Sequence, residues 1–146
     1  MIYPDLTALL SLLVTGDHTQ EASVLLRRPE HTPLSLSIVH RVQVENVLLR
    51  YLHGSDAQLQ AVSKDGLSLW RQYIEEEVFE LRSFPLDAAF AQAAAWNAEW
   101  SGQPPRWHQL VHVSLAVAEN AAFLSFDPVM RRLASKAGLS LIPTKL

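Results

Sequence analysis

The sequence predicts an α/β fold in which helices cover both faces of a central parallel sheet of four or five strands. Short apolar segments typical of buried strands alternate along the chain with longer segments of helical periodicity. Two of the strand-like segments end in an aspartate that is followed directly by a helix. The length of 146 residues, 49% of them hydrophobic, fits one domain with its own core. We therefore expect a three-layer α/β/α arrangement that occupies residues 1–146.

The first part of the chain is expected to supply two strands and two helices. Residues 2–4 are apolar and predict a short buried strand, and residues 6–14 are apolar on nearly every side, which is typical of a central helix. A second helix is expected from residue 18 to about 28. Residues 29–33 contain two prolines and predict a loop. Residues 34–38 alternate at period two and predict the second strand.

The middle of the chain is expected to add three helices and one strand. An apolar stripe at helical spacing predicts a helix over 39–52. Residues 55–77 predict a longer helix that is interrupted near 64–66, where a glycine follows two charged residues. Residues 78–84 alternate and predict the third strand. The alanine-rich segment 87–100 predicts a helix.

The last part of the chain repeats the order of helix and strand. Residues 101–105 contain glycine and two prolines and predict a loop. A strongly apolar helix is expected over 106–119 and a buried strand over 122–126. A helix is then expected over 128–137, before a glycine, and a closing strand over 139–143.

The overall composition restricts the classes of function. The net charge is −3 and weakly opposes non-specific binding of nucleic acid. No cysteine is present, which excludes disulfides and thiolate zinc sites and favours the reducing cytoplasm. No apolar run reaches the ~20 residues that span a bilayer. The opening apolar stretch lacks a basic region and a cleavage site, so neither a signal peptide nor a membrane segment is expected.

Two aspartates lie where strands of the expected sheet end. Asp5 follows the strand at 2–4 and Asp127 follows the strand at 122–126, and a helix begins directly after each. Open α/β sheets bind their ligands at the carboxyl ends of the strands. The two acids can therefore converge on one metal ion. Alternatively, each aspartate simply caps the helix that follows it.

The residues around these aspartates resemble a known family. A hydrophobic strand followed by Asp-Leu-Thr at 5–7 opens the chain. An apolar strand with Ser-Phe-Asp at 125–127, followed by Leu-Ala-Ser-Lys-Ala-Gly-Leu at 133–139, closes it. The chain resembles the PIN domain, and within it the toxin ribonucleases of VapC type, over residues 3–143.

The resemblance implies a PIN-like fold and roles for four residues near the strand ends. Asp5 and Asp127 are the expected catalytic and metal-binding acids, and Thr7 and Ser125 are the expected supporting residues. In the family, clustered carboxylates bind Mg²⁺ or Mn²⁺, which activates water to cleave RNA. Such toxins form homodimers and pair with an antitoxin, so RNA, an antitoxin and a second copy are the expected partners.

Two of the four acids that the family carries are glutamines in this chain. The family has a Glu in a segment resembling His-Arg-Val-Gln-Val-Glu-Asn-Val-Leu at 40–48, and Gln43 occupies that position. The family has an Asp in a segment resembling Arg-Trp-His-Gln-Leu-Val-His-Val-Ser at 106–114, and Gln109 occupies that position. Glu45 lies about 200° around the helix from Gln43 and is the alternative third ligand.

Replacing two acids by glutamine weakens the expected metal site. A hard cation such as Mg²⁺ is held mainly by carboxylates and waters. A glutamine oxygen can bind the ion but carries no charge. At ~4 Å and an effective dielectric constant of about 20, each lost pair of unit charges is worth about 4 kcal/mol before desolvation. We therefore expect Mg²⁺ or Mn²⁺ to bind only weakly and nuclease activity to be reduced or lost.

The sequence is also consistent with two other functions. The protein is either a binding protein that uses the degenerate cleft for a peptide or nucleic acid, or an active ribonuclease that uses Asp5, Glu45 and Asp127. The first hypothesis and both alternatives place functional groups at the strand ends. An impaired nuclease further requires that the side chains at 5, 43, 109 and 127 share one pocket.

Other polar and aromatic residues have simpler explanations. As an alternative to a role in the site, Gln43 and Gln109 are ordinary polar residues on half-exposed helix faces. His112 is expected to support the core. Arg131 and Arg132 either meet phosphate or belong to the surface. Core or interface positions are expected for the tryptophans, which are Trp70, Trp96, Trp100 and Trp107.

Overall fold

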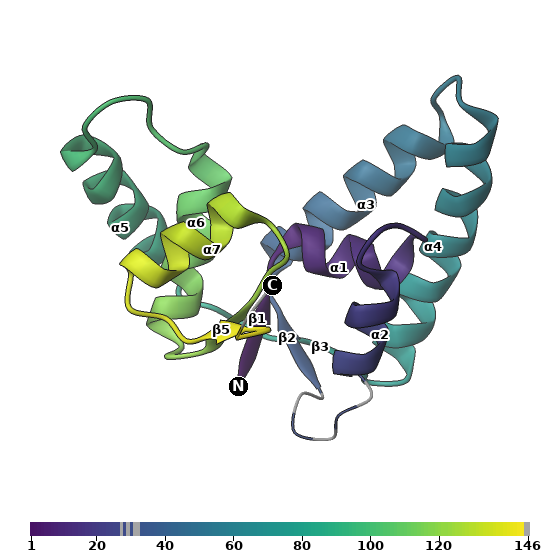
Figure 1. Cartoon of the computed structure of the whole chain (residues 1–146), viewed down its shortest axis with the longest axis horizontal. Coiled ribbons are helices and arrows are strands. Elements are labelled where there is room, and N and C mark those ends of the chain that lie inside the picture. The colour runs from purple at the N-terminus through teal and green to yellow at the C-terminus, as the bar shows by residue number, and fades with distance from the viewer. Residues whose placement is uncertain (27, 29, 31–32, 145–146) are drawn as a thin grey trace.

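The computed structural model describes residues 1–26, 28, 30 and 33–144, and these residues form seven helices and five strands (Figure 1). The helices are α1 (Leu6–Leu13), α2 (Thr19–Leu26), α3 (Ile38–Leu52), α4 (Ala57–Glu75), α5 (Leu86–Glu99), α6 (Trp107–Ala118) and α7 (Pro128–Lys136). The strands are β1 (Ile2–Pro4), β2 (Leu34–Leu36), β3 (Phe79–Leu81), β4 (Ala122–Leu124) and β5 (Leu141–Ile142). The predicted α/β class and order of elements are confirmed. Four strands are shorter than predicted, and positions 27, 29, 31 and 32 of the predicted second helix and loop lie outside the described residues.

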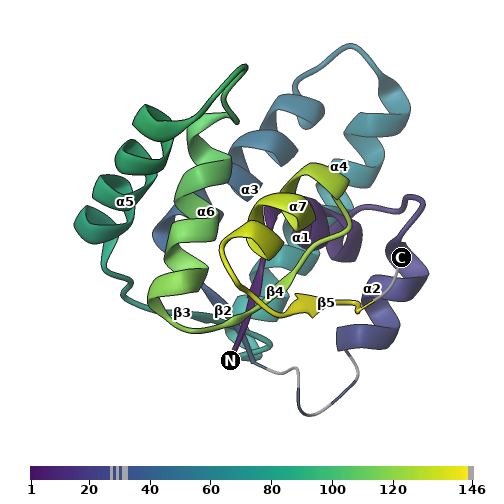
Figure 2. The ribbon, with the colours of Figure 1, turned by 60° about the vertical axis from the view of Figure 1, so that its left-hand side comes forward.

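Two apolar clusters lie on opposite sides of the strands. Ile2 and Leu124 belong to a cluster that they share with α1 to α4. Their neighbours Tyr3 and Phe123 belong to a second cluster, shared with α5, α6 and α7. Figure 1 shows the corresponding two groups of helices, one on each side of the strands, and Figure 2 shows α5 and α6 side by side within the second group. The alternation follows from strand geometry, because successive side chains point to opposite faces.

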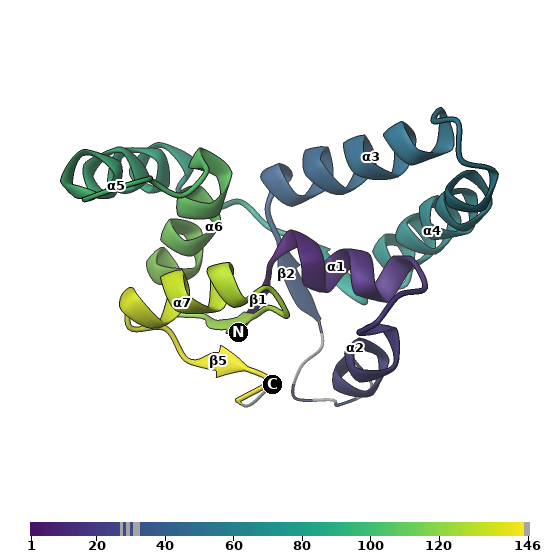
Figure 3. The same ribbon diagram turned by 45° about the horizontal axis from the view of Figure 1, so that its top comes forward.

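The strands form two small sheets, so the prediction of one sheet with four or five strands is wrong. One sheet has the order β1-β4-β5 and the other contains β2 and β3, and all the pairs are parallel. β2 lies beside β1, as Figure 3 shows, but no ladder of hydrogen bonds joins them. The carboxyl ends of β1 and β4 still lie together, because Pro4 pairs with Leu124.

Pro4 explains why β1 and β2 do not pair. The backbone groups of Met1 and Asp5 bond to β4, so the alternating groups of Ile2 and Pro4 face β2. Proline has no N–H to donate. Its carbonyl accepts a hydrogen bond of 2.8 Å from Nε2 of His40, a fully buried side chain on α3. A side chain therefore takes the place of a ladder hydrogen bond at this seam.

The interruption predicted near residues 64–66 is absent, because α4 runs unbroken through Gly66. A Cβ atom at Gly66 would lie 2.9 Å from the carbonyl oxygen of Leu13 on α1. The glycine thus permits close approach of two helices and does not end one. α4 has 19 residues, yet neither it nor any other described helix is long and apolar enough to cross a membrane.

Candidate functional site

Asp5 lies at the junction of β1 and α1 and is almost completely buried. Its Oδ1 accepts a 2.7 Å hydrogen bond from the N–H of Ala8, so the carboxylate caps α1. The Thr7 hydroxyl lies 2.8 and 3.0 Å from the two carboxylate oxygens, and the Ser125 hydroxyl donates to Oδ2 at 2.6 Å. Both predicted supporting residues therefore contact Asp5.

Asp127 lies at the junction of β4 and α7 and also caps its helix. Its Oδ1 accepts hydrogen bonds of 2.7 Å from Val129 and 3.4 Å from Met130. Its own N–H donates to Oγ of Ser125 at 3.0 Å. Ser125 thus joins the two aspartates, whose chain positions are 122 residues apart. The predicted alternative, that each aspartate caps the helix after it, is confirmed, and convergence of the two acids on one metal ion stays a prediction.

Burial raises the pKa of Asp5 from 3.8 to about 6. Removal of the carboxylate from water is the main cause, and the charge of Asp127 raises it further. The hydrogen bonds from Ser125, Ala8 and Thr7 oppose this rise because they stabilise the ionised form. The carboxylate is therefore held by protein donors in a poorly solvated position.

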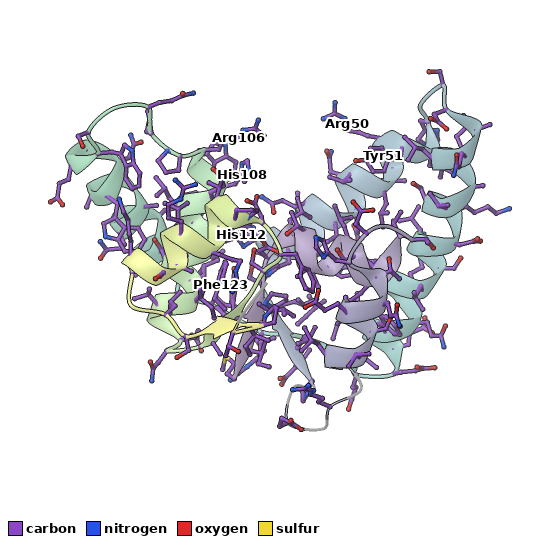
Figure 4. All side chains as sticks on the ribbon, viewed as in Figure 1. Arg50, Tyr51, Arg106, His108, His112 and Phe123 are labelled. Atoms are coloured by element: carbon purple, nitrogen blue, oxygen red, sulfur yellow. The ribbon has the colours of Figure 1, made fainter. Side chains whose placement is uncertain are left out.

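Gln43 belongs to a buried polar chain that links α3, α6 and β1. Its Oε1 lies 2.7 Å from Nε2 of His112, and the opposite ring nitrogen, Nδ1, lies 2.8 Å from the Tyr3 hydroxyl. An amide oxygen only accepts, so Nε2 carries the proton and Nδ1 accepts from Tyr3. Figure 4 shows His112 on the inner part of α6. His112 is 1% exposed, which confirms its predicted role in the core.

His40 packs against the rings of Tyr3 and His112 and extends this polar cluster toward the β1–β2 seam. Because Nε2 donates to Pro4, Nδ1 is unprotonated and accepts a 2.9 Å hydrogen bond from the N–H of Ser37. The rings of His40 and His112 lie 4.6 Å apart between centroids. Burial lowers the pKa of His40 to about 4. Burial is also the main reason that the pKa of His112 lies well below 6.5, and electrostatic repulsion from His40 lowers it further. Both imidazole rings are therefore uncharged near pH 7.

Tyr3, Ser37 and His40 were not predicted to belong to this polar cluster. The available signal was polar groups at positions that periodicity assigns to the core. Tyr3 lies in an apolar strand, and His40 precedes the apolar positions Val44 and Leu48 at helical spacing. Such residues need hydrogen-bond partners when buried.

Gln109 does not contact the histidine chain, because its Oε1 accepts a 2.9 Å hydrogen bond from the N–H of Arg106 at the start of α6. Gln109 and Asp127 line the same groove, which has a volume of about 730 Å³ and lies between α6 and α7. Asp5 and Gln43 are not among its lining residues. Of the four side chains predicted to share one pocket, only Gln109 and Asp127 line this groove.

Glu45 faces α4 and lies apart from the aspartates. Its Oε1 accepts from Nε of Arg41 at 3.1 Å and from Nε1 of Trp70 at 3.3 Å. It lines a separate groove with residues of α4 such as Arg71. This placement agrees with the 200° offset from Gln43 and removes the basis for a ligand set of Asp5, Glu45 and Asp127.

The donor set does not fit a divalent metal ion. Among the described residues, no three acidic, histidine or cysteine side chains are grouped so that they could hold one. Asp5 is occupied by three protein donors and Asp127 by the N-terminus of α7. The oxygens of Gln43 and Gln109 are also occupied. A hard cation would have to compete with the donors around Asp5, and no third carboxylate is present among the grouped described residues to compensate.

Comparisons of this chain with protein-family models, with curated proteins and with solved structures find no match.

Proposed function

We propose that this protein is a PIN-like domain, related to metal-dependent toxin ribonucleases, whose RNA-cleaving activity is lost. The spatial order β3-β2-β1-β4-β5, with α1 to α4 on one side and α5 to α7 on the other, supports a three-layer α/β/α arrangement. The meeting of Asp5 and Asp127 through Ser125 supports an ancestral acidic site.

The main support for lost activity is the engagement of both glutamines by the protein itself. The amide oxygen of Gln43 accepts a hydrogen bond from Nε2 of His112, and that of Gln109 accepts one from the N–H of Arg106. Each residue fills the position of an acid without supplying charge. A site with two carboxylates, one of them buried, binds Mg²⁺ or Mn²⁺ weakly because charge supplies most of the attraction.

Calorimetric titration with Mn²⁺ tests this proposal. The wild-type protein should bind Mn²⁺ only weakly, whereas the double variant Gln43→Glu, Gln109→Asp should bind the ion much more tightly. The variant Gln58→Glu, Gln92→Asp is the matched control, because it adds the same two charges at exposed positions of α4 and α5. Tight Mn²⁺ binding by the wild type, or no gain in the double variant over the matched control, would contradict the proposal.

An RNA cleavage assay provides the second test. Purified wild-type protein should show no metal-dependent cleavage above the level of an Asp5→Ala variant purified in parallel. Cleavage that requires Mg²⁺ and disappears in Asp5→Ala would show that the site works despite its glutamines. The Asp5→Ala control separates the activity of the protein from that of contaminating nucleases.

Binding without turnover is the alternative function. In the hydrogen bonds of the described residues, the amide nitrogens of Gln43 and Gln109 have no acceptor, so both remain available as neutral donors. A homodimer and an antitoxin partner follow from the resemblance alone. Light scattering on the purified protein tests the first, and co-expression with a neighbouring small reading frame tests the second.

A further inference from the structure

Two adjoining cavities lie on the α5, α6 and α7 side of the molecule. One is the groove of about 730 Å³ between α6 and α7, and the other is a pocket of about 260 Å³ between α5, α6 and α7. Both are lined by Trp100, Leu133 and Lys136, so they adjoin at these three residues. Asp5 lines neither cavity.

The groove is positively charged in a protein whose net charge is −3. Arg106, Arg132 and Lys136 line it, and none of them forms an ion pair within the described part of the chain. Asp127 is the one acid in its lining, and its carboxylate already accepts N–H groups of α7. Three unpaired cations against one occupied carboxylate attract an anion, most strongly one with several acceptor oxygens such as phosphate.

Gln109 adds a neutral donor to the same groove. Its oxygen faces the N–H of Arg106, which leaves its amide nitrogen without an acceptor among the described residues. An aspartate at this position would place a second negative charge in the groove. The glutamine thus favours an anionic ligand at the position where it disfavours a cation.

The adjoining pocket is aromatic and apolar. Trp96 lies in the last turn of α5 and Trp100 directly follows the helix, and Leu110, Val113 and Leu133 complete most of the lining. At about 260 Å³ the pocket is smaller than the roughly 300–1,000 Å³ of sites that bury drug-sized ligands. It therefore suits one planar ring system, for which an indole side chain is a good stacking partner.

The charged residues at the junction complete the chemistry. Nζ of Lys136 lies 4.9 Å from the centroid of the Trp100 ring, at the boundary between pocket and groove. Glu99 lines the pocket and offers an acceptor for an exocyclic amino group. A ligand that satisfies all these groups carries a flat ring with an amino group and, a short distance away, a phosphate.

We propose that the two cavities form one nucleotide-binding site. The base, of the adenine type, lies in the Trp96–Trp100 pocket, and the phosphate lies in the groove against Arg106, Arg132 and Lys136. A free nucleoside monophosphate and the 5′-terminal nucleotide of a strand share this chemistry. The site shares Gln109 and Asp127 with the proposed degenerate metal site but requires no bound metal ion. Titration with a nucleotide and titration with Mn²⁺ therefore test the two proposals separately.

Calorimetric titration with adenosine monophosphate tests the proposal. The wild type should bind adenosine monophosphate at least tenfold more tightly than adenosine or inorganic phosphate. Arg132→Gln should weaken this binding about tenfold, since a charge-assisted hydrogen bond contributes that much. Arg50→Gln is the matched control, because it removes the same charge from an exposed residue near the end of α3 (Figure 4). No binding at millimolar nucleotide, or an equal loss in both variants, would overturn the proposal.

The indole N–H signals of the four tryptophans locate the ligand independently of affinity. Addition of adenosine monophosphate should shift the signals of Trp96 and Trp100 and leave buried Trp70 unchanged. Shifts confined to Trp107 would place the ligand elsewhere and refute the site. A 5′-phosphorylated hexanucleotide of adenosine separates the two sources: tenfold tighter binding than the monophosphate indicates a strand end, and equal binding indicates the free nucleotide.

Discussion

The hydrogen bond from His40 to Pro4 predicts a large loss of stability when the imidazole is removed. In the variant His40→Phe, a ring of similar size keeps the apolar contacts but supplies neither nitrogen. The carbonyl of Pro4 and the N–H of Ser37 then lose bonds of 2.8 and 2.9 Å and remain buried. An unsatisfied buried polar group costs about 1–3 kcal/mol, so the two together cost about 2–6 kcal/mol.

Urea denaturation measures this loss against a matched control. For a domain with a total stability of about 5–15 kcal/mol, a loss of about 3 kcal/mol is a large fraction. It lowers the urea midpoint by about 1–3 M, because the slope is about 1–3 kcal/mol per M. The control His53→Phe makes the same replacement at an exposed position that follows α3 and should change stability by less than about 0.5 kcal/mol.

A second variant distinguishes the lost hydrogen bonds from altered packing. In His40→Gln, the amide nitrogen can donate to Pro4 while the amide oxygen accepts from Ser37, so part of the lost stability should return. Equal stability of His40→Phe and the His53→Phe control would refute the role of His40 at the β1–β2 seam. Equal loss in His40→Phe and His40→Gln would point to packing in place of hydrogen bonding.

Four further predictions concern the titrating groups, the packing at Gly66 and the Ser125 hydroxyl. The lowered pKa values of His40 and His112 mean that the unfolded state binds more protons from about pH 6.5 down to about 4, so stability should fall over that range in thermal unfolding. The raised pKa of Asp5 acts in the opposite direction between about pH 4 and 6, so Asp5→Asn should steepen the fall and an unchanged slope would contradict it. Gly66→Ala should destabilise by about 1–3 kcal/mol in urea because its Cβ would meet a carbonyl of α1, whereas a gain from helix propensity would show that the helices separate easily. Ser125→Ala should raise the pKa of Asp5 above about 6 in a carboxyl ¹³C titration, because the hydroxyl is its strongest stabilising donor, and no rise would contradict that role.

Local signals in the sequence predicted most of the fold. Asp5 and Asp127 were placed at strand ends before helices, and each caps its helix through N–H groups two or three residues later. Gly138, predicted to end the last helix, has a positive φ of 81°, a conformation that glycine adopts without strain. These features depend on neighbours along the chain, and residue type and order therefore determine them.

The errors in the fold arose where a local signal had a distant cause. The glycine at 66 suggested a break in a helix, but it allows α1 to approach α4 closely at Leu13, which lies 53 positions earlier in the sequence. The apolar segments suggested one continuous sheet, but Pro4 and His40 divide it. Residue 4 was visible as a proline, yet its consequence depended on which strand lay beside it.

The candidate site divides in the same way. The sequence alone predicted that two acids follow strands and showed that the chain lacks cysteine. The expectation of acids at the positions of Gln43 and Gln109 came from the resemblance to the PIN domain. Packing determined that Gln43 binds His112, that Ser125 joins Asp5 to Asp127, and that Gln109 faces a groove with three unpaired cations. Hydrogen bonds between residues 69 to 120 positions apart exist only once the strands and helices are assembled, because directional contacts of about 3 Å require both partners to be fixed in space.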